Sequence, residues 1–325
     1  MEGLSRQGSY RLVSEVLLQV CQVLTIMLLS PLIHGFIVCA EERVQGSRGP
    51  SILQPYRDLW KYLHKEQLLP ASASFIFWLA PIVAFVAMMT VPMLIPVLTN
   101  FPLPLSNIGD ILGGGLILTL AAFFLSLAGL DTGHPYGGMG SSRESILAIL
   151  AEPSLIMVFI GITLLAQSML PFVVNHLLVA SLATYLSPAH LFFVASFLIL
   201  LTVETERLPI HSSIHYEVYM IGEARILEYS GPMLGLIRWS SWMKQAILYT
   251  IFLNVLAIPW GLSSNGSVST VALSVVVLLG KWLLVAIVMV VVETVQSRLR
   301  FFRYQEPLAL ALVLAILAVV ARQVL

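Results

Sequence analysis

Acidic side chains gather in one short segment of the chain, residues 204–231, which reads ETERLPIHSSIHYEVYMIGEARILEYSG. Long apolar stretches flank this segment on both sides. A carboxylate beside a membrane span costs free energy, so such clusters usually mark ion or proton handling, or a docking surface. Carboxylates grouped in a low dielectric are suited to taking up and releasing protons near neutral pH. We therefore predict a proton or ion path that includes Glu204, Glu206, Glu217, Glu223 and Glu228.

Three more charged residues lie inside or beside expected membrane helices, and we assign them to the same path. Glu144 follows a Gly-rich stretch, in the first turn of an expected helix for which Ser141 or Ser142 would be the N-cap. Glu152 falls about two turns into the next span, where an unpaired ionised carboxylate is costly. Lys281, midway along a late span, requires an acidic partner or a water-filled path.

Structural roles compete with these functional ones. Helix capping alone would account for Glu144, because an acidic side chain is favourable in a first helical turn. Arg143 and Arg207 are predicted to form structural pairs, and Arg207 is placed to pair with Glu204 or Glu206.

The composition places these residues in a membrane protein. Of 325 residues, 58% are hydrophobic and 10% charged, against about 45–50% and 25% in soluble domains. A net charge of zero argues against a nucleic-acid partner. Cys21 and Cys39 form neither a disulfide framework nor a metal motif, and the chain has no phosphate loop or nucleophile elbow. We expect no metal, no redox cofactor of its own and no independent enzyme activity.

The apolar stretches predict an all-α polytopic membrane protein with about eight transmembrane helices in a single domain, 1–325. A helix needs about 20 apolar residues to cross the bilayer. The stretches that qualify are 13–38, 74–98, 111–130, 146–167, 188–205, 239–262, 268–295 and 307–324. Residues 170–186 are also apolar but are interrupted by Asn175 and His176, which favours an interfacial or re-entrant helix.

Loop charges predict the orientation, because Lys and Arg concentrate on the cytoplasmic side. Basic residues occur in the loops after the first, third, fifth and seventh spans and not in those after the second, fourth and sixth. The predicted cytoplasmic loops are therefore 39–73, 131–145, 204–238 and 296–306, with both termini on the other side. Arg6, Arg11 and Arg322 are exceptions near the chain ends.

The first of these loops is predicted to dock cytoplasmic subunits. Its residues 56–69 have helical periodicity, with basic side chains on one face. An amphipathic helix lying on the bilayer surface is a compatible alternative. The docking residues that we predict are Arg48, Arg57, Asp58 and Lys61.

Several loop motifs are shared with a known family of membrane subunits. They are RGP at 48–50 followed by LQPYRDLWKYLHKE, then SLAGLDTGHPYGGMGSSRE with AEP, then ETERLPI, and finally EYSG at 228–231. Together they resemble the subunit that forms the quinone chamber of respiratory complex I. In the energy-converting NiFe hydrogenases the same subunit is called formate hydrogenlyase subunit 4 or hydrogenase component C. The GLDTG…GSSRE form of the second loop and the HYEVYMIGEARILEYSG run resemble the hydrogenase branch.

The resemblance implies a non-catalytic subunit that anchors a hydrogenase-like large catalytic subunit and an iron–sulfur small subunit. It implies antiporter-like membrane subunits as neighbours, a multi-pass location in the inner (plasma) membrane, and coupling of redox chemistry to proton or sodium movement. The alternatives are the quinone-chamber subunit of a complex I-type NADH:quinone oxidoreductase and, from another class, a stand-alone secondary ion transporter. The motifs carry the family's functional positions onto Arg48, Asp58, Arg143, Glu144, Glu152, Glu204, Glu206, Arg207, Glu217, Glu223 and Glu228.

One position departs from the family pattern. After LPI the family usually has Asp, whereas this chain has His211. Replacing an anion by a titratable base inverts the local charge. The coupling of this member is therefore expected to differ from that of its relatives at His211.

Overall fold

The chain folds into a bundle of helices. The computed structural model describes residues 2–70, 72–106, 109–205, 223–295 and 305–324. Six described helices are long and apolar enough to cross a membrane. They are α1 (Glu2–Val44, with the apolar part Ser14–Val44), α3 (Phe75–Leu94), α4 (Ile111–Asp131), α5 (Pro135–Ala166), α10 (Val268–Val295) and α11 (Gln305–Val324).

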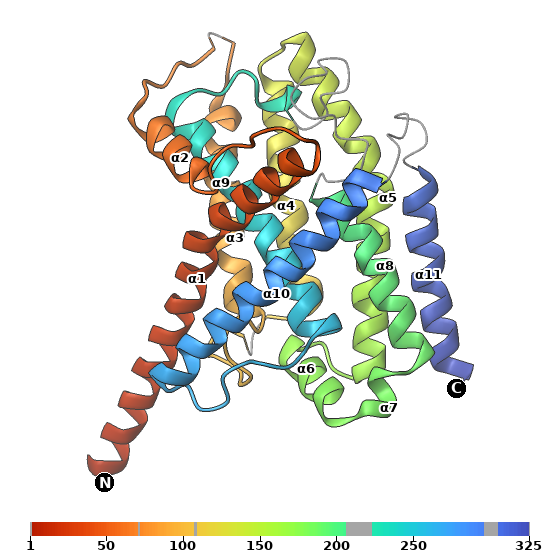
Figure 1. Ribbon diagram of the computed structural model, residues 1–325. Coiled ribbons are helices and arrows are strands. Elements are labelled where there is room, and N and C mark those ends of the chain that lie inside the picture. The colour runs from red at the N-terminus through yellow and green to blue at the C-terminus, as the bar shows by residue number, and fades with distance from the viewer. Residues whose placement is uncertain (1, 71, 107–108, 206–222, 296–304, 325) are drawn as a thin grey trace.

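Two further apolar elements complete the bundle (Figure 1). Helix α8 (Pro188–Glu204) packs against α11 and α5. Helix α9 (Gly231–Thr250) continues into η3 (Ile251–Ala257), a π-helical turn that leaves the α-helical register. The prediction of an all-α polytopic membrane protein is confirmed.

The helix that carries the second loop motif begins earlier than predicted. Helix α5 starts at Pro135 with His134 as its N-cap, so Ser141 and Ser142 lie inside the helix and the N-cap prediction was wrong. Proline is favoured in the first turn of a helix, where its missing N–H would have no partner. Glu144 consequently lies in the second or third turn of α5, where it can face a neighbouring element.

The apolar segment 170–186 forms two short helices, α6 (Pro171–Ala180) and α7 (Leu182–Tyr185). Both are too short to cross a bilayer. They lie at the same end of the molecule as the start of α1 and the end of α11, whereas α2 (Gln54–His64) lies at the opposite end (Figure 1).

Small residues and close helix contacts build the interior. Gly115 and Gly161 leave room for the rings of Phe159 and Phe193, because a Cβ at either glycine would overlap the ring. Glycine at helix contacts is typical of membrane bundles. Helix α10 has 28 residues, about 42 Å of helix, and crosses the bundle obliquely (Figure 1). A span longer than the bilayer thickness is accommodated by such a tilt.

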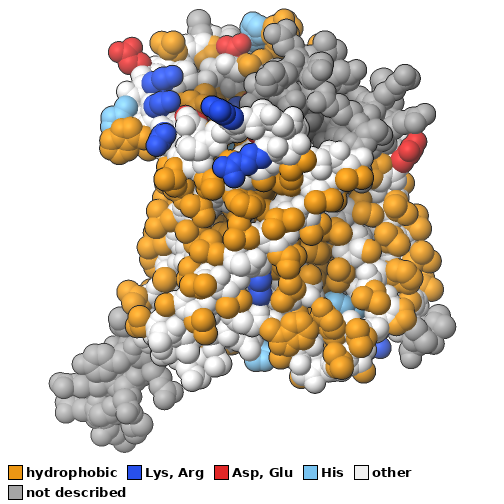
Figure 2. Space-filling view, viewed as in Figure 1, with side chains coloured by type: hydrophobic (Ala, Val, Ile, Leu, Met, Phe, Trp, Pro, Cys, Tyr) orange, Lys and Arg blue, Asp and Glu red, His pale blue; other side chains and the backbone are white. Residues whose placement is uncertain are grey.

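The surface separates apolar and charged side chains (Figure 2). Hydrophobic side chains cover the middle of the visible face, and Lys and Arg gather at the end that carries α2 and the C-terminal part of α1. This distribution is the one expected of a protein embedded in lipid with one basic end.

Candidate functional site

Four elements bring opposite charges together at the α2 end of the bundle: α5, α8, η2 (Ala224–Ile226) and α9. Arg225 Nη1 lies 3.4 Å from Glu144 Oε1, and Lys244 Nζ lies 2.8 Å from Glu204 Oε2. Arg238 donates two hydrogen bonds to the carboxylate of Glu223. We refer to the residues of this arrangement as the charge cluster: Glu144, Glu152, Glu204, Glu223, Arg225, Arg238 and Lys244.

Glu152 is the member of the charge cluster that lies furthest along α5. Its side chain is partly buried, and the charges that act on it are those of Glu204, Lys244 and Glu144. The carboxylates of Glu152 and Glu204 thus share the field of one ammonium group. Gain or loss of a proton at either carboxylate changes how strongly the other is held by Lys244.

Close backbone approach places Arg225 beside Glu144. A methyl group at Gly140 would lie 2.7 Å from the backbone nitrogen of Arg225 and 2.9 Å from the Cβ of Ala224. Only a residue without a Cβ lets η2 rest on this turn of α5. Gly140 of the Gly-rich second motif therefore allows the close packing that places Arg225 beside Glu144.

The EYSG motif ties the charge cluster to the first loop. The Tyr229 hydroxyl donates to the carbonyl of Phe77 over 2.8 Å, and the two rings stack with centroids 3.9 Å apart. Burial raises the pKa of Tyr229 well above its usual value, and the charge of Asp131 raises it further, so the phenol remains a neutral donor. Ser230 Oγ accepts from the Leu68 amide and donates to the Leu68 carbonyl.

Gly231 completes this contact. Its φ of +53° is in the left-handed region that favours glycine, and a Cβ there would lie 2.7 Å from the carbonyl oxygen of Glu66. Glu228, in the same motif, lies 3.6 Å from His134 Nδ1, which is the N-cap residue of α5. The first, second and third loops therefore meet at one place.

The structure gives partners for three carboxylates of the charge cluster. Arg225 pairs with Glu144, and Glu223 pairs with Arg238. The described partner of Glu204 is Lys244, which sequence reasoning overlooked, and the predicted pairing of Arg207 with Glu204 or Glu206 stays a prediction because Arg207 lies outside the described residues. The signal for Lys244 was present, because a lysine inside an apolar span needs a partner.

Other predicted residues stay untested. Glu206, Arg207, Glu217 and His211 lie outside the described residues. Arg143 lies in α5 next to Glu144, and its side chain is partly buried.

Lys281 lies apart from the charge cluster, in a different environment. The residue is 7% exposed, and its ammonium group donates to Asn254 Oδ1 and to the Ile258 carbonyl, each over 2.8 Å. In the described part of the chain no carboxylate pairs with it, so of the two expectations, an acidic partner or a water-filled path, the first is not met by the described residues. The helix ends at η3, whose C-cap residue is Ile258, so the Ile258 carbonyl lies outside the helical hydrogen bonds and accepts from Lys281.

Two buried asparagines hold this environment in place. Asn254 Nδ2 donates to the carbonyls of Pro96 and Val97, at 2.9 and 3.0 Å. Asn175 Nδ2, from the short helix α6, donates to the Asn254 carbonyl over 2.6 Å and to the Pro259 carbonyl over 2.9 Å. We refer to Lys281, Asn254 and Asn175 as the Lys281 site. Sequence reasoning treated Asn175 only as an interruption and did not consider Asn254.

The predicted docking residues lie on or beside α2. Arg48, Arg57 and Lys61 are exposed, and Asp58 accepts from Gln54 over 2.9 Å and lies 3.5 Å from Lys61. The inner face of α2 packs on the bundle through Leu59, which is buried, while Trp60 on the outer face is 67% exposed. An exposed tryptophan among basic residues suits either a protein partner or the membrane interface.

No metal site is formed by the side chains in the described ranges. Among those residues no group of three or more His, Cys, Asp or Glu side chains is placed to hold a metal ion. The cysteines Cys21 and Cys39 are both free.

The fold defines a helical membrane protein with several spans, and comparison with known proteins gives its family. Residues 16–322 match the family described as NADH dehydrogenase, and this chain belongs to that family. The chain is 30% identical to hydrogenase-4 component C of Escherichia coli strain K12, over 93% of this chain and 94% of that protein. It is 31% identical to formate hydrogenlyase subunit 4 of the same organism, over 88% of this chain and 91% of that protein.

A solved structure supports the fold. A chain of the membrane-bound sulfane sulfur reductase, an archaeal respiratory membrane complex, superposes with a TM-score of 0.75. That likeness covers 94% of this chain and 99% of that chain at 19% sequence identity. The family match and the two relatives identify this protein as a membrane subunit of a hydrogenase- or complex I-like respiratory complex.

Proposed function

We propose that this chain is a non-catalytic subunit that anchors cytoplasmic redox modules to the membrane and couples their electron flow to proton or sodium movement. The observation that carries the proposal is the charge cluster. Carboxylates and basic groups from four elements lie within reach of one another, and Glu152 extends the set into a membrane helix. Charges placed inside a membrane bundle are costly and usually serve ion pathways.

The connection between loops supports the coupling role. Residues of the EYSG motif contact the first loop through Leu68 and the second through His134. A partner that moves the first loop would therefore also move η2, which carries Arg225. Displacing Arg225 from Glu144 by even a few ångströms changes the electrostatic energy of that carboxylate. We infer that the docked redox module acts on the ion path through this connection.

The anchoring role rests on the exposed face of α2. We propose that Arg48, Arg57, Asp58 and Lys61 contact a hydrogenase-like large subunit or its iron–sulfur small subunit. Antiporter-like subunits would then lie beside the bundle in the plane of the inner (plasma) membrane. Charge reversal at Arg57 to glutamate should reduce the amount of cytoplasmic subunit that co-purifies, and the difference from wild type should be largest at low salt, where exposed charges are least screened. Co-purification equal to wild type would exclude this face as the interface.

The coupling role is tested with Glu152→Gln, which keeps the shape of the side chain and removes its charge. The complete complex would be reconstituted in vesicles, and electron transfer and ion movement would be measured together. We expect unchanged electron transfer and at least a tenfold loss of ion movement per electron, because loss of a general acid–base group typically costs about 10²–10⁴-fold. Glu306→Gln, an exposed carboxylate at the start of α11, is the matched control. Normal ion movement in Glu152→Gln would refute the assignment.

A further inference from the structure

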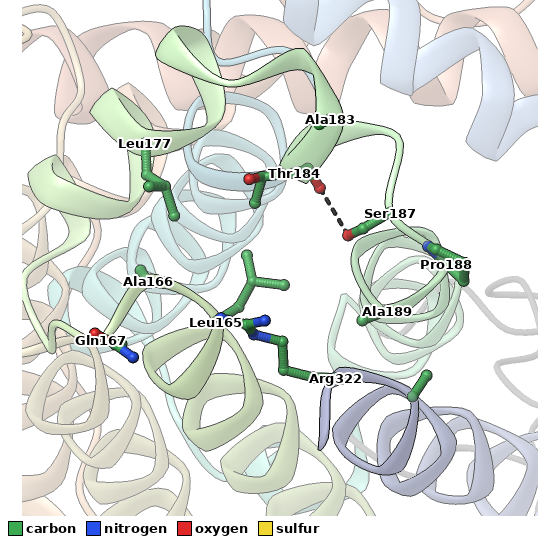
Figure 3. Close-up of a pocket in the computed structure, with 11 residues that line it drawn as sticks. Leu165, Ala166, Gln167, Leu177, Ala183, Thr184, Ser187, Pro188, Ala189 and Arg322 are labelled. Carbon is green, nitrogen blue, oxygen red and sulfur yellow. Dashed lines mark hydrogen bonds between the residues drawn. The ribbon is translucent and has the colours of Figure 1, made fainter. Parts of the chain in front are cut away.

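A cavity of about 450 Å³ (Figure 3) opens at the end of the bundle that carries α6 and α7, which is opposite the α2 end in Figure 1. Its walls come from the end of α5, from α6 and α7, from the start of α8 and from the end of α11. Because α5, α8 and α11 end or begin here, the cavity lies at the boundary between the apolar bundle and water. Leu165 and Ala321 give it an apolar part, and Gln167, Thr184 and Ser187 give it a polar part.

Arg322 is the charged residue in the lining. Figure 3 shows its side chain reaching from α11 toward Leu165, across the space that Thr184 and Ser187 border. The side chain is exposed, and no carboxylate of a described residue pairs with it. Arg322 is also an exception to the predicted concentration of basic residues in the loops at the other end. A cation at this end of the bundle that has no counter-charge among the described residues suits an anionic ligand.

Gln167 adds an independent observation at the same cavity. Its φ is +50°, and it is the one described residue other than glycine with a positive φ. A left-handed conformation costs a residue with a side chain about 1 kcal/mol or more, and such strain tends to occur at functional sites. Glycine is the usual residue at this position of a helix end. Glycine at position 167 would relieve this backbone strain, but the chain has glutamine there, which places a side-chain amide at the rim of the cavity.

The surroundings of the cavity are apolar and exposed. Leu186 is 59% exposed beside α7, Leu191 is 52% exposed on α8, and Leu317 and Val320 are 47% and 49% exposed on α11. A free inorganic anion would gain nothing from this surface. A phospholipid would cover it with its acyl chains, since burying such surface is worth about 25 cal/mol per Å².

We propose that this cavity binds the headgroup of an anionic phospholipid, with its phosphate at Arg322. The amide of Gln167 lies on the same lining and can donate to the phosphate or to the polar headgroup. The Ser187 hydroxyl donates to the Thr184 carbonyl over 2.7 Å, and the Thr184 hydroxyl is hydrogen-bonded to Ser181, so these two side chains shape the rim of the cavity. The acyl chains lie along the exposed apolar faces of α8 and α11. A bound lipid would fasten the end of α11 to α5 and α8, which α11 already contacts.

The test is to count lipids retained by the purified complex. The complex would be equilibrated in nanodiscs of equimolar phosphatidylcholine and phosphatidylglycerol, extracted in mild detergent, and analysed by mass spectrometry for lipid per protein. We expect phosphatidylglycerol to be enriched in wild type, and the enrichment to fall about fivefold in Arg322→Gln, because one Arg–anionic lipid contact is worth about 1 kcal/mol. Lys65→Gln, which removes an exposed cation at the other end, should retain the enrichment.

A second variant keeps the test decisive if Arg322→Gln lowers the yield of complex. Ala183→Phe fills the cavity from an exposed position on α7 and should also abolish the enrichment. Equal retention of the two lipids by wild type, or unchanged enrichment in both variants, would overturn the proposal. It would also be overturned if inorganic phosphate in lipid-free detergent protected Arg322 from an arginine-selective reagent as well as phosphatidylglycerol does. The proposal would also be overturned if phosphatidylglycerol were no longer enriched when a partner subunit contacts α11, because the surface would then be a protein interface.

Discussion

The charge cluster and the Lys281 site solve the same problem, a charge among apolar helices, in opposite ways. In the charge cluster each described cation faces a carboxylate, and the side chains keep 10–32% of their exposure in the three pairs. At the Lys281 site a more deeply buried cation faces only neutral oxygens of an asparagine and a backbone carbonyl. The pairs of the charge cluster respond to any neighbouring change of charge, whereas the Lys281 site is held by fixed dipoles.

The difference has a consequence for stability. Removing the cation of an ion pair leaves its carboxylate without a counter-charge in a low dielectric, which is strongly destabilising. Removing a cation that faces neutral dipoles leaves only polar groups short of a donor. The two regions should therefore respond very differently to the same substitution of lysine by methionine.

The largest effect is expected for Lys244→Met. The substitution removes the ammonium group that pairs with Glu204 and that also acts on Glu152. It should destabilise the subunit by about 3 kcal/mol, which is the lower end of the range for breaking a buried pair, because this pair is partly exposed. Thermal denaturation of the purified complex would measure the loss. Adding Glu204→Gln to Lys244→Met should restore much of the lost stability, because no uncompensated carboxylate then remains at position 204. The control Lys61→Met, which breaks a largely exposed pair with Asp58, should cost about 0–1 kcal/mol. Equal losses of stability in Lys244→Met and Lys61→Met would contradict the view that the pair in the charge cluster differs from an exposed surface pair.

A smaller loss is expected for Gly140→Ala. The new methyl group would meet the backbone of η2, and overpacking of this kind costs about 1–3 kcal/mol. Because η2 carries Arg225, the pair with Glu144 should weaken as well. Gly138→Ala is the matched control, since no atom lies within 4 Å of its added Cβ and alanine favours a helix. Denaturation curves in which the two alanines behave alike would contradict the close packing of η2 on α5.

The smallest effect on stability is expected for Lys281→Met. Asn254 Oδ1 and the Ile258 carbonyl lose a donor, but a buried charge is removed at the same time, so the net loss should be about 1 kcal/mol. The proposed ion path nevertheless predicts a clear loss of ion movement, measured in vesicles. A loss of stability as large as that of Lys244→Met would show that the site is mainly a structural one.

The sequence was sufficient to locate the six long apolar helices and the four carboxylates of the charge cluster, because both depend on residue type. Helices 111–131 and 268–295 match their predicted ranges closely, since apolar runs and flanking turn residues define them locally. The partners could not be predicted in the same way. Glu204 and Lys244 are brought together by the packing of α8 and α9, and nothing in the sequence near Glu204 specifies that contact.

The Lys281 site shows a second limit of the sequence. Asn254 lies in an apolar run that predicts an uninterrupted span, and the π-helical turn that contains it has no strong local signal. Its contacts with the segment around Pro96 join residues more than 150 positions apart. Such a network follows from tertiary packing, which overrides local preference.

The most direct test of the account is the exchange of charges within one pair, Glu204→Lys with Lys244→Glu. The exchange keeps an ion pair and so should preserve assembly and electron transfer. It moves the carboxylate from α8 to α9, and it thereby alters the electric field that acts on Glu152 and on the rest of the path. Ion movement per electron would be measured in vesicles that contain the complete complex. The account predicts a complex that transfers electrons at the wild-type rate and moves few or no ions. Wild-type ion movement in the exchanged complex would contradict it.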